Sequence, residues 1–462
     1  MMLGVLSGCG DSTSDSTAEA PVQSADSAES SAADESTESE SDQTESSKSG
    51  KETAKPESSS KADKDSKDAK DSKSDSSSKD DSSAKSEDSG TENQSGTKAE
   101  TKQNETKGTT AVQNPAQRPE NNTQNVEDPD DSDPEDEVKP TKYIYLEDTT
   151  AKYSGEGINV KGGLITISKG GTYEITGTLS NGQILINTDK KKVKLHLNGA
   201  SITNKAGSAI NCQCAKKLTL NSLAGSVNYL EDGGVHDEDK GTVFSEDTVQ
   251  IKGEGELNIK ANYAHGVQSD DDIIVNGGIL NIEATKSCLH SNDGIEINAG
   301  VNYCYGGTNG IKTDGYINIT GGSSIFIGGV REEKGAIYCD GSLSVTGGSF
   351  WAIGNTCTAP DASTTTANVI GLMFANAQPA GSLVNVTSGN NGVFTMTSPN
   401  NYKYVIYSGP ELLMNAEYSV NYGGSTDGNG DHFVYYGGSY TPGKDGGSFT
   451  AGNAVTFYTV TG

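Results

Sequence analysis

The sequence predicts an all-β fold built as a parallel β-helix, a solenoid of stacked coils. Three observations point to this fold. A motif recurs every 22 to 26 residues, its apolar positions alternate instead of following helical spacing, and Gly, Asn and Asp bound each short apolar run. A repeat of this length with period-2 alternation is typical of a solenoid in which every coil contributes short strands. Leucine-rich repeats have a similar period, but their Leu-x-x-Leu-x-Leu spacing is absent here.

Residues 1–10 resemble the end of a bacterial lipoprotein signal. The stretch "MMLGVLSGCG" places Leu6, Ser7 and Gly8 directly before Cys9, which is the pattern of a lipobox whose cysteine receives a lipid. The apolar run before it is shorter than a signal peptide requires, so an ordinary initiator segment is the alternative. No other stretch approaches the ~20 apolar residues of a membrane span. We therefore expect the chain to meet a membrane only through lipid on Cys9.

Residues 11–140 are expected to form a disordered tether. Ser, Asp, Glu, Lys and Thr dominate this segment, and no aromatic residue precedes Tyr143. Such a composition cannot bury enough apolar surface to offset the entropy cost of ordering. As a random coil the segment would span roughly 60 Å, which suits a tether that carries a folded domain through the wall of a Gram-positive bacterium. We therefore expect an extracellular, cell-surface protein; a functionless acidic tail is the alternative.

The whole chain is acidic, with a formal net charge of −29 and a pI near 4.5. A negative potential of this size argues against nucleic acid and anionic membrane surfaces as partners. It favours divalent cations, and an acidic polymer could bind only through bridging cations or local basic residues. The sequence leaves the oligomeric state open.

Residues 141–462 carry every aromatic side chain and are expected to form the folded domain. From 143 to about 235, apolar and polar residues alternate between Gly and Asn turns, as in "GGLITISKGGTYEITGTLSNGQILIN". The repeated motif then follows. From about 400 to 462 the composition turns to Tyr and Gly. We expect a capping β-element there, because an uncapped solenoid exposes an open strand edge.

The repeats align on one apolar anchor residue each, at spacings of 24, 22, 22 and 26. Stacking the coils about 4.8 Å apart would turn each motif position into a column through successive coils. One such column is apolar and is expected to point into the core. The anchors are Val243, Val267, Leu289, Ile311 and Ile337, and the core column contains Val249, Ile273, Ile295, Ile317 and Leu343.

Two further columns are acidic and lie at the turn that follows each anchor strand. Two carboxylates one coil apart repel by about 1 kcal/mol in water and by about 3.5 kcal/mol at an effective dielectric of 20. Ca²⁺, which takes about six to eight oxygen ligands, would relieve this repulsion. Hydrated turn residues that bond only to the local backbone are the alternative. The candidate ligands, including Asp272 outside the two columns, are Glu246, Asp247, Asp270, Asp271, Asp272, Asn292, Asp293, Asp314 and Asp340.

Four stretches follow one another along the folded part: "GGTYEITGTLSNGQILINTDKKKVKLHLNGASITNKAGSAI", "NYLEDGG", "SDDDIIVNGG" and "YSGPELLMNAEYSVNYGG". As an ordered set they resemble the clostridial carbohydrate-binding β-helix family, over roughly residues 143 to 460. The resemblance implies a right-handed, pectate-lyase-like β-helix that binds calcium between coils and binds cellulose or acidic pectic polymers at cell surfaces. Carried onto this chain, it implies calcium ligands among Asp270, Asp271, Asp272, Asn292, Asp293 and Asp314.

Non-catalytic binding of a polysaccharide is the function that these features favour. A β-helix offers long flat faces on which a polymer meets similar groups in every coil. Sugar rings bind by stacking on aromatic faces, with hydrogen bonds around them. The candidate aromatic side chains could equally lie in the core or at a coil edge. They are Tyr303, Tyr305, Tyr338 and Trp351.

Two alternatives stay open. A polysaccharide lyase acting on pectate-like polymers needs a neutralised uronate and a base, and Lys312 is the candidate base because it lies two residues before Asp314. Neighbouring carboxylates stabilise the charged form of a lysine, which favours a salt bridge over catalysis. A surface adhesin that binds proteins is the other alternative, and nothing in the sequence specifies its partner.

Overall fold

The computed structural model describes residues 111–115, 117, 125–126, 140, 142–236, 240–329, 331 and 333–462. Cys9 and the predicted tether up to residue 110 lie outside these described residues. Every helix or strand assigned within them is a β-strand, which confirms the all-β fold. In the described part of the chain, no helix is long and apolar enough to cross a membrane.

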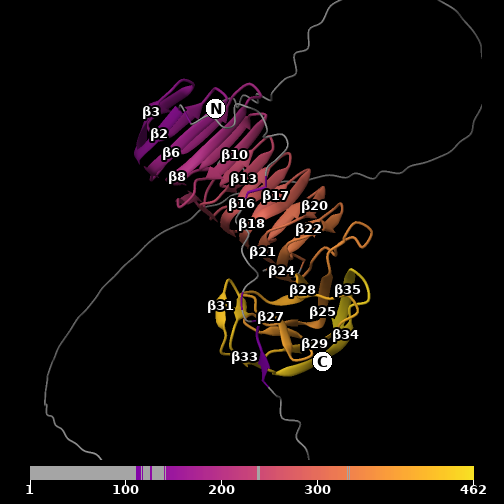
Figure 1. Cartoon of the computed structure of the whole chain (residues 1–462). Coiled ribbons are helices and arrows are strands. Elements are labelled where there is room, and N and C mark those ends of the chain that lie inside the picture. The colour runs from indigo at the N-terminus through magenta and orange to yellow at the C-terminus, as the bar shows by residue number, and fades with distance from the viewer. Residues whose placement is uncertain are drawn as a thin grey trace, which may run out of the picture. The chain divides into compact units, whose positions relative to one another are not determined.

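Successive coils stack in parallel, and their strands form three faces along the solenoid (Figure 1). The first face is a nine-stranded sheet. After the antiparallel pair β4–β5 at its start, each strand pairs in parallel with the strand of the next coil. Its strands are β4 (Ile158–Lys161), β5 (Leu164–Ile167), β7 (Gln183–Asn187), β9 (Ile210–Cys214), β12 (Val243–Ser245), β15 (Val267–Ser269), β17 (Leu289–Ser291), β19 (Ile311–Thr313) and β22 (Ile337–Cys339).

The second and third faces meet at a corner that the longest strands cross. The register of β16 on β18 shifts at this corner. The crossing strands are β6 (Gly171–Leu179), β8 (Lys192–Asn204), β16 (Ile273–Ala284) and β18 (Gly294–Gly306). The second face also contains β10 (Lys217–Ser222), β13 (Val249–Gly253), β20 (Tyr316–Ile319) and β23 (Leu343–Val345), and the third contains β11 (Val227–Asp232), β14 (Glu256–Ala261), β21 (Ser323–Ile327) and β24 (Ser349–Gly354). The hairpin β2 (Lys142–Asp148) and β3 (Thr150–Ser154) joins β6 at the N-terminal end.

The predicted register between coils is confirmed. The anchor residues pair in order along the first face, and the core column pairs in order along the second. Every residue of the core column is at most 1% exposed. Burying such a side chain stabilises the fold by about 1.5–3 kcal/mol. A one-residue slip would turn the column to solvent, so burial opposes it at every coil.

Glycine occupies the corner between the second and third faces in successive coils. Gly278, Gly300, Gly322 and Gly348 have φ between 76° and 86°, a left-handed conformation that side chains disfavour. A Cβ at Gly322 would lie 2.8 Å from the carbonyl oxygen of Ala299 in the preceding coil. The backbone angle and the close approach of the coils both require glycine at this corner.

The last strands form a β-element at the C-terminal end of the stack (Figure 1). It begins at Val369, before the boundary expected near residue 400. Its strand β28 pairs antiparallel with β24 of the last coil, and apolar side chains from both sides of the junction form one buried cluster. Its strands are β25 (Val369–Gln378), β26 (Val384–Ser388), β27 (Asn391–Met396), β28 (Tyr402–Ser408), β29 (Glu417–Tyr422), β30 (Ser425–Thr426), β31 (Asn429–Asp431), β32 (Val434–Tyr436), β33 (Ser439–Thr441), β34 (Lys444–Thr450) and β35 (Val455–Val460).

Part of the segment predicted to be disordered is ordered. Strand β1 (Val112–Gln113) pairs antiparallel with β33 of the C-terminal element, and the next residue, Asn114, is buried. Asn114 Nδ2 donates to Thr426 Oγ1 (2.8 Å) and to the Gly437 carbonyl (2.7 Å), and its Oδ1 accepts from Thr395 Oγ1 (2.7 Å). The prediction of disorder is wrong for residues 112–114. Composition could not reveal these contacts, because the partners lie far away in the sequence.

A second stretch of the same segment contacts the corner of the solenoid. The backbone N–H of Val126 donates to the Asn276 carbonyl (2.8 Å), and the backbone N–H of Gly253 donates to Asn125 Oδ1 (2.8 Å). Together with β1, these contacts fix two points of the chain before residue 142 against the folded domain.

We expect Asn114→Ala to destabilise the C-terminal element. The substitution removes the three hydrogen bonds of a buried side chain, to Thr395, Thr426 and the Gly437 carbonyl, and we expect their combined loss to cost about 1–3 kcal/mol. Chemical denaturation should show a lower midpoint, and limited proteolysis should cut sooner beside β1. Gln113→Ala, which removes an exposed side chain of the same strand, is the matched control and should leave the midpoint unchanged. Equal midpoints for both variants would show that the attachment of β1 does not stabilise the domain.

Candidate functional site

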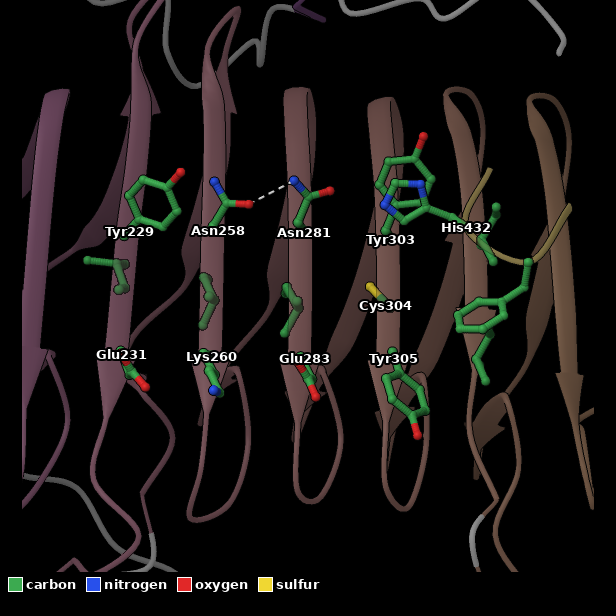
Figure 2. Close-up of a pocket in the computed structure, with 16 residues that line it drawn as sticks. Tyr229, Glu231, Asn258, Lys260, Asn281, Glu283, Tyr303, Cys304, Tyr305 and His432 are labelled. Atoms are coloured by element: carbon green, nitrogen blue, oxygen red, sulfur yellow. Dashed lines mark hydrogen bonds between the residues drawn. The ribbon is translucent and has the colours of Figure 1, made fainter. Parts of the chain in front are cut away.

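A groove runs along the third face, across β11, β14, β16 and β18 (Figure 2). Its volume is about 440 Å³, which is within the range of sites that hold small ligands. Two rows of outward-pointing side chains flank it, and their positions repeat from coil to coil. The first row contains Tyr229, Asn258, Asn281 and Tyr303, and the second contains Glu231, Lys260, Glu283 and Tyr305.

The alternation of side chains along each strand produces these rows. Leu230, Ile259 and Ile282 occupy the position between the rows and are buried in the core, so the residues on either side of them point outward. Parallel pairing places the equivalent residues of successive coils next to one another. Each row therefore presents one side chain per coil, at a rise of about 4.8 Å.

The first row is uncharged and partly hydrogen-bonded within itself. Asn281 Nδ2 donates to Asn258 Oδ1 (2.9 Å), as the dashed line in Figure 2 shows. Asn281 Oδ1 is shielded from solvent and has no hydrogen-bond partner among the residues that the structure describes. Tyr229, at one end of the row, is 53% exposed. The row thus offers an open aromatic face at Tyr229, and it would offer the Asn281 oxygen to a ligand hydroxyl once the side chain turned that atom toward the groove.

The second row alternates in charge. Glu231, Lys260 and Glu283 are register neighbours in successive coils, so the ammonium lies between two carboxylates along the row (Figure 2). Asn262 Nδ2 also donates to Glu231 Oε1 (3.1 Å). These three residues bring one negative charge in excess, and they present both hydrogen-bond donors and acceptors to a ligand in the groove.

A two-residue loop of the C-terminal element closes one end of the groove. His432 stacks on Tyr303 (Figure 2), with ring centroids 3.4 Å apart and ring planes at 14°. The ring of Phe433 lies 6.4 Å from that of Tyr305. Asp431 Oδ1 lies 2.6 Å from His432 Nδ1. An ionised carboxylate can only accept, so Nδ1–H donates and the imidazole is held in one orientation. The groove therefore has an aromatic end wall.

Two of the four aromatic residues predicted to bind sugar, Tyr303 and Tyr305, line the groove. Tyr338 lies on the first face at 38% exposure, and its hydroxyl donates to Asp340 Oδ1 (2.6 Å). Trp351 is 1% exposed and packs against the C-terminal element. It offers no face to a sugar, because that element covers the strand on which it lies, and we leave it out of the candidate site.

Sequence reasoning missed Tyr229, Asn258, Asn281 and His432. For the first three a signal exists in the segments "VNYLED", "ELNIKA", "ILNIEA" and "VNYCYG". Aligned on their inward apolar residue, these segments place Tyr, Asn, Asn and Tyr in one column. His432 has no such signal, because it reaches the groove from the C-terminal element.

The acidic turn lies between the first and second faces, away from the groove. Burial raises the pKa of four of its carboxyl groups. For Asp271 the charges of Asp247 and Asp293 raise the pKa further, and for Asp272 the charge of Asp293 does so. Asn292 Nδ2 donates to one carboxylate of the turn at 3.4 Å. The four groups are Glu246, Asp270, Asp271 and Asp272.

Several predicted calcium ligands already have other partners. Asp247 accepts from Lys190 Nζ (2.8 Å) and from the backbone N–H of Ala215 (2.7 Å), and Asp314 accepts from Lys312 Nζ (2.9 Å). Across the described ranges, no three His, Cys, Asp or Glu side chains are grouped so that they could hold a metal ion. The oxygen donors of the turn are of the type that Ca²⁺ takes, and calcium stays a prediction.

Lys312 lies on the first face, outside the groove. Its Nζ is 3.2 Å from His290 Nε2 and 2.9 Å from Asp314 Oδ1, and it lies 5.8 Å from the centre of the Tyr338 ring. The ion pair with Asp314 is the arrangement that the salt-bridge alternative expects. A lyase using Lys312 would have to bind its substrate on this face, away from the groove.

Comparison with known proteins places the chain in a family. The family model described as carbohydrate-binding domain-containing protein matches residues 161–398, which is more than half of the 462 residues. The chain therefore belongs to this family. The matched segment contains both rows of the groove, whereas His432 and Phe433 lie beyond it.

A relative and a solved structure show partial similarity. A protein of Acetivibrio thermocellus, described as carbohydrate-binding domain-containing protein, is 30% identical over 151 residues, which are 31% of this chain and 53% of that protein. This chain thus spans about half the length of that relative. The solved structure is titled as the polysaccharide lyase-like protein from C. thermocellum, gadolinium derivative. It is 25% identical with a TM-score of 0.39, over 46% of this chain and 94% of that chain.

Proposed function

We propose that this chain is a non-catalytic polysaccharide-binding protein and that the groove on the third face holds the carbohydrate. The observation that carries the proposal is the groove itself, in which aromatic, amide and charged side chains repeat once per coil along two rows. Aromatic faces stack on sugar rings, and amide and carboxylate groups hydrogen-bond to hydroxyls. Membership of a carbohydrate-binding family supports this assignment.

The proposed ligand is a plant-type polymer, either cellulose or an acidic pectic polymer. The first row is uncharged and suits a neutral chain. Lys260 offers one cation to a uronate, but Glu231 and Glu283 flank it in the row, so an acidic chain would need bridging cations to overcome their repulsion. The composition of the groove therefore favours the neutral polymer.

We expect Tyr229→Ala and Asn281→Ala each to weaken binding about tenfold. Loss of the aromatic stack at Tyr229 costs about 0.5–1.5 kcal/mol and loss of a hydrogen bond at Asn281 costs about the same, and a loss of about 1.4 kcal/mol, near the upper end of both ranges, corresponds to a factor of ten. Pull-down on insoluble cellulose and gel retardation with pectate measure the effect. Tyr153→Ala is the matched control, because Tyr153 is similarly exposed at 48% and does not line the groove. Full binding by both groove variants would move the site elsewhere.

Other outcomes separate the alternatives. Release of unsaturated products that absorb in the ultraviolet would favour the lyase, and Lys312→Ala should then abolish that release. No retention of the wild-type protein on any polysaccharide would contradict the proposed function and favour an adhesin that binds proteins.

The second part of the proposal is calcium at the acidic turn. Glu246, Asp270, Asp271 and Asp272 gather oxygen donors whose raised pKa values reflect burial and, for all but Asp270, repulsion by neighbouring carboxylates. A divalent cation would stabilise the charged forms of these groups. It would also lie where successive coils meet, so its binding would stabilise the stack.

We expect Asp271→Asn to raise the melting temperature at pH 7 in the presence of a chelator. Because the pKa of Asp271 is raised in the folded state, its charged form costs stability above that value, and this cost disappears as the pH falls below the ordinary Asp value of about 3.9. The gain in melting temperature should therefore vanish below about pH 4. Calcium should raise the melting temperature of the wild type more than that of the variant.

Asp361→Asn is the control for this experiment. Hydrogen bonds from Ser363 lower the pKa of Asp361, so removing its charge should bring no gain at pH 7. Titration calorimetry of Ca²⁺ into chelator-treated protein is the direct test of binding. Absence of heat, together with equal melting temperatures in calcium and chelator, would contradict the calcium site.

The third part of the proposal concerns location. We propose that lipid on Cys9 anchors the protein to the membrane of a Gram-positive bacterium and that the acidic segment carries the domain to the cell surface. The pattern Leu6-Ser7-Gly8-Cys9 supports this. Cys9→Ala should move the protein from the membrane fraction into the medium or the soluble fraction, and an unchanged distribution would contradict the anchor.

A further inference from the structure

We propose that the groove binds the end of a polysaccharide chain and not its interior. The inference rests on the proposed function and deepens it. It follows from an asymmetry of the groove, which is open toward the N-terminal coils and closed by the C-terminal element. An extended polymer lying along the coil axis can therefore enter from one direction only.

The same two columns that form the groove continue beneath the C-terminal element. In the next two coils Tyr303 is followed by Ile325 and Trp351, and Tyr305 by Ile327 and Ile353. These four following residues are at most 2% exposed and belong to the apolar cluster shared with the C-terminal element. Ile325 and Ile327 line the closed end of the groove, and beyond them Trp351 and Ile353 leave no surface on which a sugar could lie.

The loop that forms the end wall has a backbone conformation that non-glycine residues rarely adopt. His432 and Phe433 connect β31 to β32 as a two-residue hairpin loop, and their φ angles are 45° and 72°. Tight hairpin loops with two positive φ angles usually contain Asn and Gly. Two large aromatic residues at such positions are strained, and strained residues of this kind cluster at ligand clamps. The loop thus places two rings over Tyr303 and Tyr305 at a conformational cost.

The opposite end of the groove lacks a wall. Before Tyr229 and Glu231, the columns contain the small residues Ser201 and Thr203, and Thr178 in the preceding coil is exposed. A polymer can therefore leave the groove along the axis past Tyr229. Three coil steps separate Tyr229 from Tyr303, or about 14 Å, which leaves room for a few sugar rings between the open end and the wall.

The aromatic rings and the charged Asp431 at the end wall suit the terminal sugar of a polysaccharide chain. The Tyr303–His432 stack and the Tyr305–Phe433 pair present ring edges and faces, and Asp431 fixes the imidazole of His432. A terminal ring carries a hydroxyl where an internal ring carries a glycosidic bond. Only the terminal ring can stop at this wall, since an internal ring would need space for the next sugar.

The experiment compares polymers of equal mass that differ in the number of chain ends. Samples of one insoluble cellulose, intact and partly hydrolysed, are titrated with the full-length protein. We expect the number of protein molecules bound per mass to rise in proportion to the chain ends, and short soluble oligosaccharides of the same sugar to compete fully. Capacity that does not change with chain ends would overturn the inference while leaving the proposed function intact. No retention on any sample would overturn both.

A second experiment uses a variant that lacks the two aromatic rings of the end wall. His432→Gly combined with Phe433→Gly suits the positive φ angles, so the fold should be kept, as the melting temperature checks. Because the C-terminal element still covers the columns beyond Tyr303 and Tyr305, the variant should keep its dependence on chain ends but bind short oligosaccharides several-fold more weakly, since the terminal sugar loses the two rings of the wall. Leu413→Gly combined with Met414→Gly, in an exposed loop of the same element, is the matched control and should behave as wild type. Unchanged affinity of the double glycine variant for short oligosaccharides would contradict the assigned role of His432 and Phe433.

Discussion

The parallel register between coils is the constraint on which the rest of the molecule depends. Backbone hydrogen bonds hold each strand one coil rise from the next, and the buried column from Val249 to Leu343 fixes which residues are paired. Once this column is buried, every other side chain has a determined direction, because the period along a strand is two. The groove rows on the third face and the acidic columns at the turn are both consequences of that one register.

The same register places carboxylates of successive coils next to one another, and neighbouring side chains reduce their repulsion. At the acidic turn, Lys190 pairs with Asp247, and the Tyr316 hydroxyl lies within hydrogen-bond distance of Asp272 and Glu296. This relief is incomplete, because burial and then the charges of neighbouring carboxylates raise the pKa of Glu246, Asp271 and Asp272. The second row of the groove avoids this repulsion, because opposite charges alternate along it and neighbouring side chains attract one another. A column is thus stabilised or strained according to which residues the repeat places in it.

The coil register could be predicted from sequence because it is encoded within each repeat, by an apolar residue at a fixed distance from a turn. The groove could not, because its end wall comes from His432 and Phe433, which lie far along the chain from Tyr303 and Tyr305. Trp351 failed as a candidate for the same reason: an aromatic residue on an outward position looks available until the element that covers it is known. Asn114 shows the converse, since a polar residue in an acidic tract becomes ordered only through distant partners.

A solenoid must end, and the element that ends this one also forms the end wall of the groove. An open final coil would expose unpaired backbone groups to other chains, and the C-terminal element covers that coil through β28 and a shared apolar cluster. Along one column the chemistry changes from Asn281 and Tyr303 to Ile325 and Trp351 at the point where this cover begins. The change marks the boundary between the open groove and the strands that the C-terminal element covers. The length of the groove is therefore set by where the cap begins, and not by the number of coils.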